Sequence, residues 1–288
     1  MSDKIFFDVV NMSITGSFAI LIIILVRLLL RKAPKVFSYT LWFVAFFRLL
    51  VPFSFESVLS ILPFNTMPLS TDMLYIETPC VETGIKVIDN VINPVVATEI
   101  FGSSINVYQA FTFCGKIIWY IGVFIFLLHT IRSYFKLKEK LQNAVLLRDN
   151  IYITQTISTP FAIGLRNPKI YLPSNLASTQ EYVIAHEQAH LSRHDNLAKV
   201  IGYVILVLHW FNPLVWIAFK LFVTDMEMSC DERVIRKAKT DIRKEYSQSL
   251  LDLSIEKSTL GVPMAFAEGS PKERIINIMK SNTKKIIG

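Results

Sequence analysis

The sequence contains little cysteine, and its cysteines form no recognisable framework. The 288 residues include three cysteines without a C-x-x-C pair, and an odd number cannot complete a set of disulfides. They are Cys80, Cys114 and Cys230, of which Cys114, in an apolar run, and Cys230, in a charged segment, are expected to be free thiols. Zinc-finger spacings and helix-turn-helix patterns are missing as well. These absences argue against a disulfide scaffold and against direct nucleic-acid binding.

Charged residues are also scarce. They make up 18% of the chain, against roughly 25% in an average soluble protein. In their place the chain is 52% hydrophobic, with a mean hydropathy of +0.43. The formal net charge is +7, but the basic residues cluster beside apolar segments, where anionic lipid headgroups are the expected partner. The composition therefore predicts a protein whose main non-protein partner is the lipid bilayer.

Three apolar runs predict transmembrane helices, at 15–31, 38–55 and 108–131. Basic residues fill the turn at 31–36 and follow the third run, so the positive-inside rule places both segments in the cytoplasm. The N-terminus and the loop 56–107 then lie outside, and this loop carries six acidic residues against a lone Lys86. Two charges lie inside the runs: Lys116 is expected to snorkel, and Arg48 to face a neighbouring helix or a water-filled gap. We expect a multi-pass protein of the bacterial cytoplasmic membrane.

The remaining residues, 132–288, predict a cytoplasmic domain. Short β-type runs between 144 and 173, broken by glycine and proline, indicate a small antiparallel sheet. Two helices are expected next, at 177–200 with Ser178 as N-cap and Glu181 three residues on, and at 241–258. The basic, amphipathic tail 270–288 is compatible with the membrane surface. The fold class is thus α+β: three N-terminal transmembrane helices followed by a mainly helical domain with a small antiparallel sheet.

The stretch AHEQAHLSRHD (185–195) carries the chemistry, because it contains the spacing H-E-x-x-H. On a helix, His186 and His190 project from one face and can put two imidazole nitrogens on one Zn²⁺ ion. Glu187 lies beside them, placed to take a proton from water as the catalytic base. The alternative is an ordinary polar helix turn with two histidines, which this pattern disfavours in a chain with only five histidines.

A catalytic zinc ion needs a third protein ligand and an open position. TDMEMSCDE (224–232) offers Glu227 as that ligand, with Asp231 one helical turn on. Asp231 and Asp195 are candidates for holding the ligating histidines through their other ring nitrogens. Two further histidines compete: His194, expected to point past the metal, and His209, which could be a ligand, a catalytic hydrogen-bond donor to the transition state or a buried core histidine.

The metal hypothesis constrains the apolar run 200–223. If it crossed the membrane, His190 and Glu227 would lie roughly 30 Å apart and could not share an ion. Asn212-Pro213 divides the run into halves that are each too short to span. We therefore expect a membrane-associated helical hairpin at 199–224 that folds back. STPFAIGL, with Pro160, is expected at a sheet edge, where it could either hold an extended substrate or simply pack beneath the active-site helix.

In this order the motifs resemble a known family, the integral-membrane zinc metallopeptidases of the β-lactam sensor-transducers (BlaR/MecR type). The matching stretches are STPFAIGLRNPKIYLP, HEQAHLSRHD, HWFNPLVW, DMEMSCD and AFAEGSPKERI. The resemblance implies that His186, His190 and Glu227 bind zinc, that Glu187 is the base, and that the protein cleaves a DNA-binding repressor directly or indirectly. The chain departs from the family in one respect: the sensor-transducers carry a further transmembrane span and an extracellular penicillin-binding domain after the protease region, whereas these residues include neither, and their S-x-x-K strings lack S-D-N and K-T-G partners. Either the sequence is a piece of a longer chain, or this member responds to another signal or through another subunit. β-Lactam sensing by these residues is therefore not expected, and another signal, a partner sensor subunit or a homodimer stays open.

Three functions remain open from the sequence. The first is a membrane-bound zinc endopeptidase that cleaves a repressor or another cytoplasmic or membrane-proximal protein. The second is a protease for membrane-protein quality control. The third is a non-enzymatic signal transducer whose zinc only staples the fold. An intact Glu187 favours the enzymes, because a structural site has no need of a base.

Overall fold

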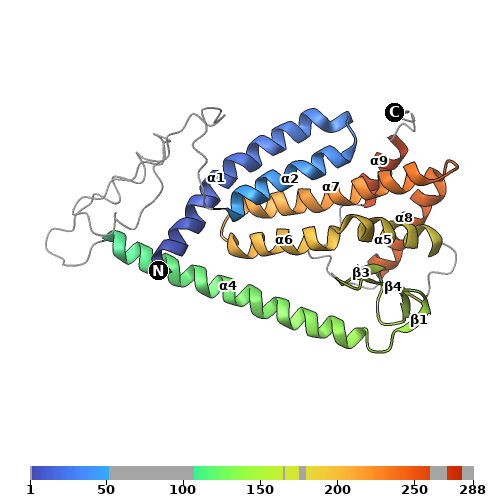
Figure 1. Cartoon of the computed structure of the whole chain (residues 1–288), viewed down its shortest axis with the longest axis horizontal. Helices are drawn as coiled ribbons and strands as arrows, with labels where there is room; N and C mark the ends of the chain where they lie inside the picture. Colours follow the sequence, from blue (N-terminus) through green and yellow to red (C-terminus); the bar gives the residue numbers. More distant parts are fainter. Residues whose placement is uncertain (1, 52–106, 165, 175–179, 260–270, 281–288) are drawn as a thin grey trace.

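A computed structural model describes residues 2–51, 107–164, 166–174, 180–259 and 271–280. The chain begins with a helical hairpin of α1 (Ser2–Leu29), a 3₁₀ turn (Leu30–Lys32) and α2 (Lys35–Leu50) (Figure 1). Pro34 ends the turn as the N-cap of α2, where its missing N–H is not needed. A Cβ at Gly16 would lie 2.3 Å from Leu49 Cδ2, so glycine lets α1 and α2 approach closely.

Two segments are long and apolar enough to cross a membrane, Asp3–Lys32 and Gln109–Lys140. The second belongs to α4 (Val107–Lys140), which at 34 residues is about 51 Å long. Both helices extend beyond the predicted spans 15–31 and 108–131. The ammonium of Lys116 in α4, which was expected to snorkel, pairs with Asp3 of α1.

The predicted second span, 38–55, corresponds to α2, which has 16 residues and is about 24 Å long. That is short of the roughly 30 Å hydrocarbon thickness. Residues 52–55 and the predicted external loop 56–107, with Cys80, lie outside the described residues. Length and composition thus identify two candidate spans among the described helices, not three.

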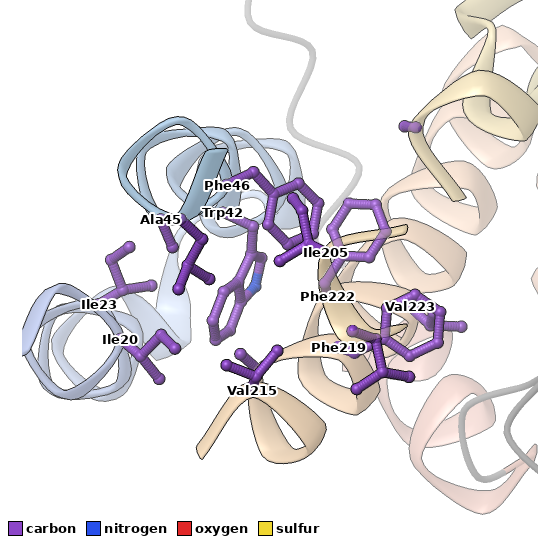
Figure 2. Packing of buried hydrophobic residues seen from close by; sticks show 14 of the residues in the cluster. Ile20, Ile23, Trp42, Ala45, Phe46, Ile205, Val215, Phe219, Phe222 and Val223 are labelled. Atoms are coloured by element: carbon purple, nitrogen blue, oxygen red, sulfur yellow. The ribbon is translucent and has the colours of Figure 1, made fainter. Parts of the chain in front are cut away.

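The predicted fold-back is present. α6 (Asp195–Leu208) and α7 (Pro213–Lys237) lie side by side, and residues 209–212 connect them (Figure 1). The Asn212 side chain accepts the N–H of Leu214 at 2.9 Å, and Pro213 occupies the first helical position. α7 also packs on α1 and α2 through a core that includes Trp42, Phe46 and Phe222 (Figure 2). The α1–α2 hairpin and the helix that carries Glu227, α7, therefore share one core.

The sheet follows α4 and contains β1 (Val145–Arg148), β2 (Ile151–Thr154), β3 (Phe161–Ile163) and β4 (Lys169–Pro173). Its order is β1-β2-β4-β3, and β2 pairs with β4 in parallel. The expectation of a purely antiparallel sheet was therefore wrong. The connection from β2 leads to the far edge, and β4 returns between β2 and β3, so its direction matches that of β2. A short turn makes this return possible, and Gly164 in it has a φ of +114°. β3 does lie at the edge, as Pro160 predicts.

Three more helices complete the domain: α5 (Gln180–Arg193), α8 (Arg243–Thr259) and α9 (Pro271–Lys280). The helix predicted over 177–200 is broken at His194, whose φ of 58° is left-handed, so α5 and α6 are separate elements. The predicted N-cap Ser178 lies outside the described residues. The tail was expected at the membrane surface, but its described part, α9, packs against α7 and α8 and buries Arg274 and Ile278. Its apolar face is used within the protein.

Candidate metal centre

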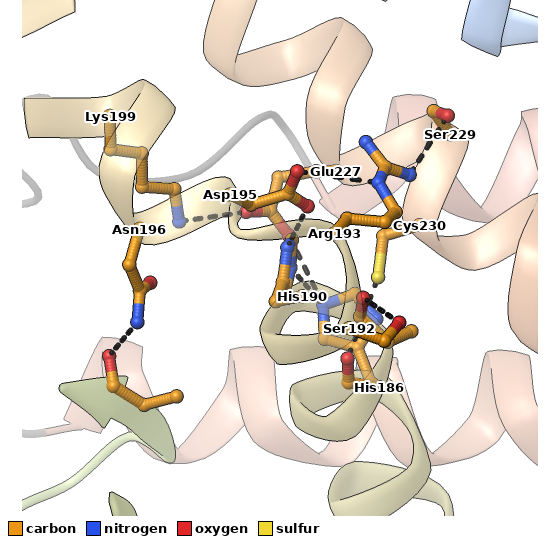
Figure 3. A network of polar contacts seen from close by, with 12 residues as sticks. His186, His190, Ser192, Arg193, Asp195, Asn196, Lys199, Glu227, Ser229 and Cys230 are labelled. Atoms are coloured by element: carbon orange, nitrogen blue, oxygen red, sulfur yellow. Dashed lines mark hydrogen bonds and ion pairs between the residues drawn. The ribbon is translucent and has the colours of Figure 1, made fainter. Parts of the chain in front are cut away.

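Two helices bring three donor atoms together in the interior of the domain (Figure 3). His186 and His190 lie one turn apart on α5, and their Nε2 atoms are 3.1 Å apart. Glu227 of α7 places its Oε2 atom 3.2 Å from His186 Nε2 and 3.4 Å from His190 Nε2. All three residues are buried. The fold-back of the α6–α7 hairpin thus joins residues that are about 40 positions apart in the sequence.

The spacing of these donors suits a tetrahedral metal ion. Ligands about 2.0–2.1 Å from a zinc ion at tetrahedral angles lie roughly 3.3–3.4 Å from one another. The three observed separations, 3.1, 3.2 and 3.4 Å, are close to that value. Two imidazoles and one carboxylate are also a donor set that zinc uses in hydrolytic enzymes. The residues present therefore fit a zinc ion with one position left open.

The far nitrogen of His190 is held by a carboxylate directly, and that of His186 mainly through a tyrosine hydroxyl that a carboxylate holds. His190 Nδ1 donates to Asp195 Oδ2 at 2.7 Å. His186 Nδ1 donates to the Tyr246 hydroxyl oxygen at 2.8 Å, and that hydroxyl donates to Asp231 Oδ1 at 2.7 Å. These bonds place the protons on Nδ1 and leave each Nε2 lone pair directed at the centre. Asp195 and Asp231 therefore lie where they can orient the histidines, although Asp231 acts mainly through Tyr246.

The buried charges shift the pKa values of the metal-free site. Burial by itself would lower the pKa of His190, but the Glu227 and Asp195 carboxylates outweigh it and raise that pKa well above 6.5. Burial raises the pKa of Glu227, yet His190 and Lys199 lower it well below its usual range. Burial also raises the pKa of Asp231, while Arg274 lowers it more, to about 2. The carboxylates thus stay ionised and attract a cation.

Several residues at the site were missed by sequence reasoning. Arg274 of α9 donates to both oxygens of Asp231 at 2.7 and 2.8 Å and lies 3.5 Å from Glu227 Oε2. Lys199 of α6 lies 3.3 Å from Glu227 Oε1. Arg274 belongs to the quoted stretch AFAEGSPKERI, which was the available signal for it. Nothing in the local sequence around Tyr246 or Lys199 indicates the site, because their contacts cross between helices.

A cavity of about 110 Å³ opens beside the donors. Glu187, itself buried, lines it together with His186, His190 and Glu227. The edge strand β3 also lines the cavity, through Phe161 and Ala162. The Asn196 side chain donates to the Ala162 carbonyl at 3.1 Å and ties β3 to the start of α6.

Cys230 is a second candidate for the third ligand. Its thiol is buried in α7, and one ligand atom from each of His186, His190 and Cys230 lies within 4.8 Å of the others. Burial raises the pKa of the thiol, but the two histidines lower it more, to about 7. The thiol also donates to the His186 carbonyl at 3.5 Å. The Glu227 oxygen lies 3.2 and 3.4 Å from the two histidine nitrogens, so both Glu227 and Cys230 are within reach of the centre.

The two competing histidines, His194 and His209, do not join the centre. His194 is exposed at the break between α5 and α6. His209 is fully buried at the far end of α6, about 20 Å along the helix axis from Asp195, and its Nδ1 donates to the Ile205 carbonyl at 3.1 Å. A catalytic role for His209 at this centre is therefore not supported, and it belongs to the core of the hairpin.

These features place the chain among the membrane metallopeptidases. Residues 7–278 match the family described as BlaR1 peptidase M56, and the chain belongs to that family. It is similar to the "Regulatory protein BlaR1" of Bacillus licheniformis, with 28% identity over 227 residues, 65% of this chain and 38% of that protein. It is also 23% identical to the "Methicillin resistance mecR1 protein" of Staphylococcus aureus over 276 residues, 85% of this chain and 46% of that protein. The BlaR1 of Staphylococcus aureus is 22% identical over 300 residues, 93% of this chain and 50% of that protein. The chain thus spans at most half the length of these relatives.

Proposed function

We propose that this protein is a membrane-bound zinc endopeptidase that hydrolyses a peptide bond in a cytoplasmic or membrane-proximal protein. The observation that carries the proposal is the triangle of His186, His190 and Glu227 donors, with Glu187 beside it on the wall of one cavity. His186, His190 and Glu227 would hold the ion, with Asp195 and Asp231 orienting the histidines. When bound there, zinc would polarise the scissile carbonyl and acidify water.

The chain's own residues then supply the proton transfers. Glu187 takes a proton from the attacking water while the water oxygen bonds to the carbonyl carbon. The same carboxyl returns the proton to the amide nitrogen as the C–N bond breaks, so the products are a carboxylate and an amine. Arg274 and Lys199 line the cavity. In this proposal they, and not His209, stabilise the developing oxyanion. The β3 edge is the surface on which an extended substrate would add as a strand.

The names of the relatives support a regulatory role. Because the similar proteins are called regulatory and methicillin-resistance proteins, a transcriptional repressor is the substrate that we propose, cleaved on the cytoplasmic side. The proposed setting is a bacterial cytoplasmic membrane with the N-terminus outside. α2 would be a third, short span, and the α6–α7 hairpin would lie against the bilayer. The basic 3₁₀ turn and the basic end of α4 support this orientation.

Replacing the proposed base tests the enzyme. Glu187→Gln keeps the side-chain shape but cannot accept the proton, so we expect zinc per chain to stay unchanged and cleavage to fall at least about 100-fold. Cleavage is measured with purified protein in nanodiscs and a repressor encoded beside the gene. Glu181→Gln, an exposed position on the same helix, is the matched control and should keep full activity. Unchanged cleavage in Glu187→Gln would refute this role.

A non-enzymatic transducer with a structural zinc ion is the second candidate. The observation that favours it is Cys230, because a thiolate as fourth ligand would close the position that water needs. Under this alternative, Cys230→Ser weakens zinc binding and signalling survives Glu187→Gln. Loss of signalling in Glu187→Gln with zinc still bound would exclude it.

A further inference from the structure

A second cavity lies between the start of α2 and the C-terminal part of α7, apart from the metal centre. It encloses about 310 Å³. Its wall is divided into an apolar part from α2 and a basic part from α5 and α7. The residues that matter are Val36, Tyr39 and Phe43 on the apolar side and Arg193, Arg233 and Arg236 on the basic side.

The basic side carries uncompensated positive charge. Within the described part of the chain, Arg233 and Arg236 have no ion pair with a carboxylate, and Arg233 Nε is buried without a hydrogen-bond partner. Arg193 itself is paired with Asp195 at 3.3 Å, but its buried Nη2 stays without a partner. The one acidic residue in the wall, Glu232, already accepts the backbone N–H of Lys35 at 2.8 Å and the Asn277 amide at 3.1 Å. The unpaired guanidinium groups of Arg233 and Arg236, together with the Nη2 of Arg193, thus face one engaged carboxylate, an arrangement suited to an anion.

The cavity lies at the level where the membrane surface is expected. The candidate span of α1 ends at Lys32, and Pro34, two residues later, already lines the cavity. The apolar side continues outward from it, because Val36, Phe37 and Phe43 of α2 are all exposed. An occupant with an anionic group at one end and a hydrocarbon chain at the other would match both sides at this depth.

We propose that this cavity binds an anionic phospholipid of the adjacent leaflet, with its phosphate against the three arginines and one acyl chain along Val36 and Phe43. Arginine is the side chain best suited to phosphate, since its planar guanidinium offers two parallel donors. A lipid is favoured over free phosphate because its acyl chain would bury the apolar half of the wall, whereas a small anion would leave that half uncovered.

Such a lipid would touch the residues that hold the metal centre. The Arg193 guanidinium lies 4.6 Å from the centre of the Tyr39 ring, and both side chains contact Asp195 Oδ1, at 3.3 and 2.9 Å. Asp195 in turn holds His190. This coupling rests on the proposed metal site, whereas lipid binding does not, so the two can fail separately.

The test is native mass spectrometry of the full chain in a zwitterionic detergent, titrated with phosphatidylglycerol or phosphatidylcholine. We expect the wild type to bind one phosphatidylglycerol at least about tenfold more tightly than phosphatidylcholine, because a tenfold difference in affinity is small for charge-assisted hydrogen bonds. The double variant Arg233→Gln/Arg236→Gln should lose this preference. Lys237→Gln/Lys239→Gln removes the same charge from the same end of α7 outside the cavity and should keep it.

Three outcomes would overturn the proposal. The first is equal binding of the two lipids by the wild type, and the second is an unchanged preference in the double variant. The third is displacement of phosphatidylglycerol by millimolar glycerol phosphate as effectively as by the lipid itself, which would make a soluble phosphate the ligand. Arg236→Gln alone, at an exposed position, guards against misfolding of the double variant and should show a partial loss.

Discussion

At the scale of single residues, the main question is which side chain completes the metal site. Glu227 and Cys230 lie on neighbouring faces of α7, and both reach the two histidines. The carboxylate is held from the other side by Lys199 and Arg274, which keep it ionised. The thiol has the backbone carbonyl of His186 as its partner. With either residue as the third ligand one position stays open for water, whereas Cys230 in addition to Glu227 would fill it, so the ligand set bears on function.

The choice can be measured with two nearly isosteric substitutions. Glu227→Gln removes the charge of the proposed ligand, so we expect zinc to bind about 100-fold more weakly or to be lost on purification. Cys230→Ser should retain one zinc per chain, because the serine hydroxyl still fits beside the His186 carbonyl. Zinc content by mass spectrometry of the purified proteins distinguishes them. The reverse pattern would make Cys230 the ligand.

The raised histidine pKa values predict a pH dependence. Zinc binds neutral imidazole. In the metal-free site burial lowers the pKa of both histidines, but Cys230, Tyr246 and Asp231 raise the pKa of His186, and Glu227 and Asp195 raise that of His190, in each case well above 6.5. Protons therefore compete with zinc already near neutrality, and the zinc Kd should weaken steadily as the pH falls from about 8 to about 6. Competition against a chromophoric chelator measures it. His194→Ala, which removes an exposed histidine, should follow the same curve, and a pH-independent Kd would contradict the assignment.

At the scale of elements, the hairpin α1–α2 is tied to the helices of the site by polar contacts. Arg27 of α1 and Trp42 of α2 both donate to the buried Asp225 of α7, at 2.8 and 2.9 Å. Tyr39 of α2 donates to Asp195 at the start of α6. Asp225 lies two positions before Glu227, and Asp195 holds His190. A displacement of the α1–α2 hairpin would therefore shift the side chains that adjoin two of the three proposed ligands, Glu227 and His190.

The Tyr39 contact can be removed without disturbing packing. Tyr39→Phe deletes the hydroxyl that Asp195 accepts, so His190 should be held less firmly and the zinc Kd should weaken about three- to tenfold, less than for a direct partner of a ligand. Tyr203→Phe deletes a hydroxyl bonded to Thr130 between α4 and α6 and serves as the control. Chelator competition gives both Kd values. Equal Kd values in the two variants would show that the hairpin does not support the site.

At the scale of the whole molecule, the helices that carry the site, α5 and α7, lie between the α1–α2 hairpin and the sheet that follows α4 (Figure 1). Helix α4 connects the α1–α2 hairpin with the sheet, since it begins near α1 and four residues separate its end from β1. Both candidate spans have basic residues at the end that leads toward the metallopeptidase domain. The two ends of α1 should therefore lie on opposite sides of the bilayer.

Accessibility to a membrane-impermeant maleimide tests this topology. In a chain with Cys80 and Cys114 replaced by alanine, Lys4→Cys should react in intact cells, while Arg31→Cys and Lys138→Cys should react only after lysis. All three native side chains are exposed, so protection reflects the membrane. Labelling of Lys138→Cys in intact cells would invert the proposed orientation.

The sequence by itself determined what depends on local spacing. Four-residue separation on a helix was enough to predict that His186 and His190 share a face. The Asn212-Pro213 break, together with the need for Glu227 to reach the same ion, predicted that the apolar run folds back. The edge position of β3 followed from Pro160, because proline cannot donate to a sheet ladder. These features rest on the backbone geometry of a few neighbouring residues.

Only the tertiary structure decided the contacts that cross between elements. It brought Tyr246, Arg274 and Lys199 to the centre, placed His209 far from it, and set β4 parallel to β2. It also broke the predicted helix at His194, which turns Asp195 back toward His190. Which side chains meet across helices depends on how whole elements pack, and the local sequence around each residue carries no record of the partner.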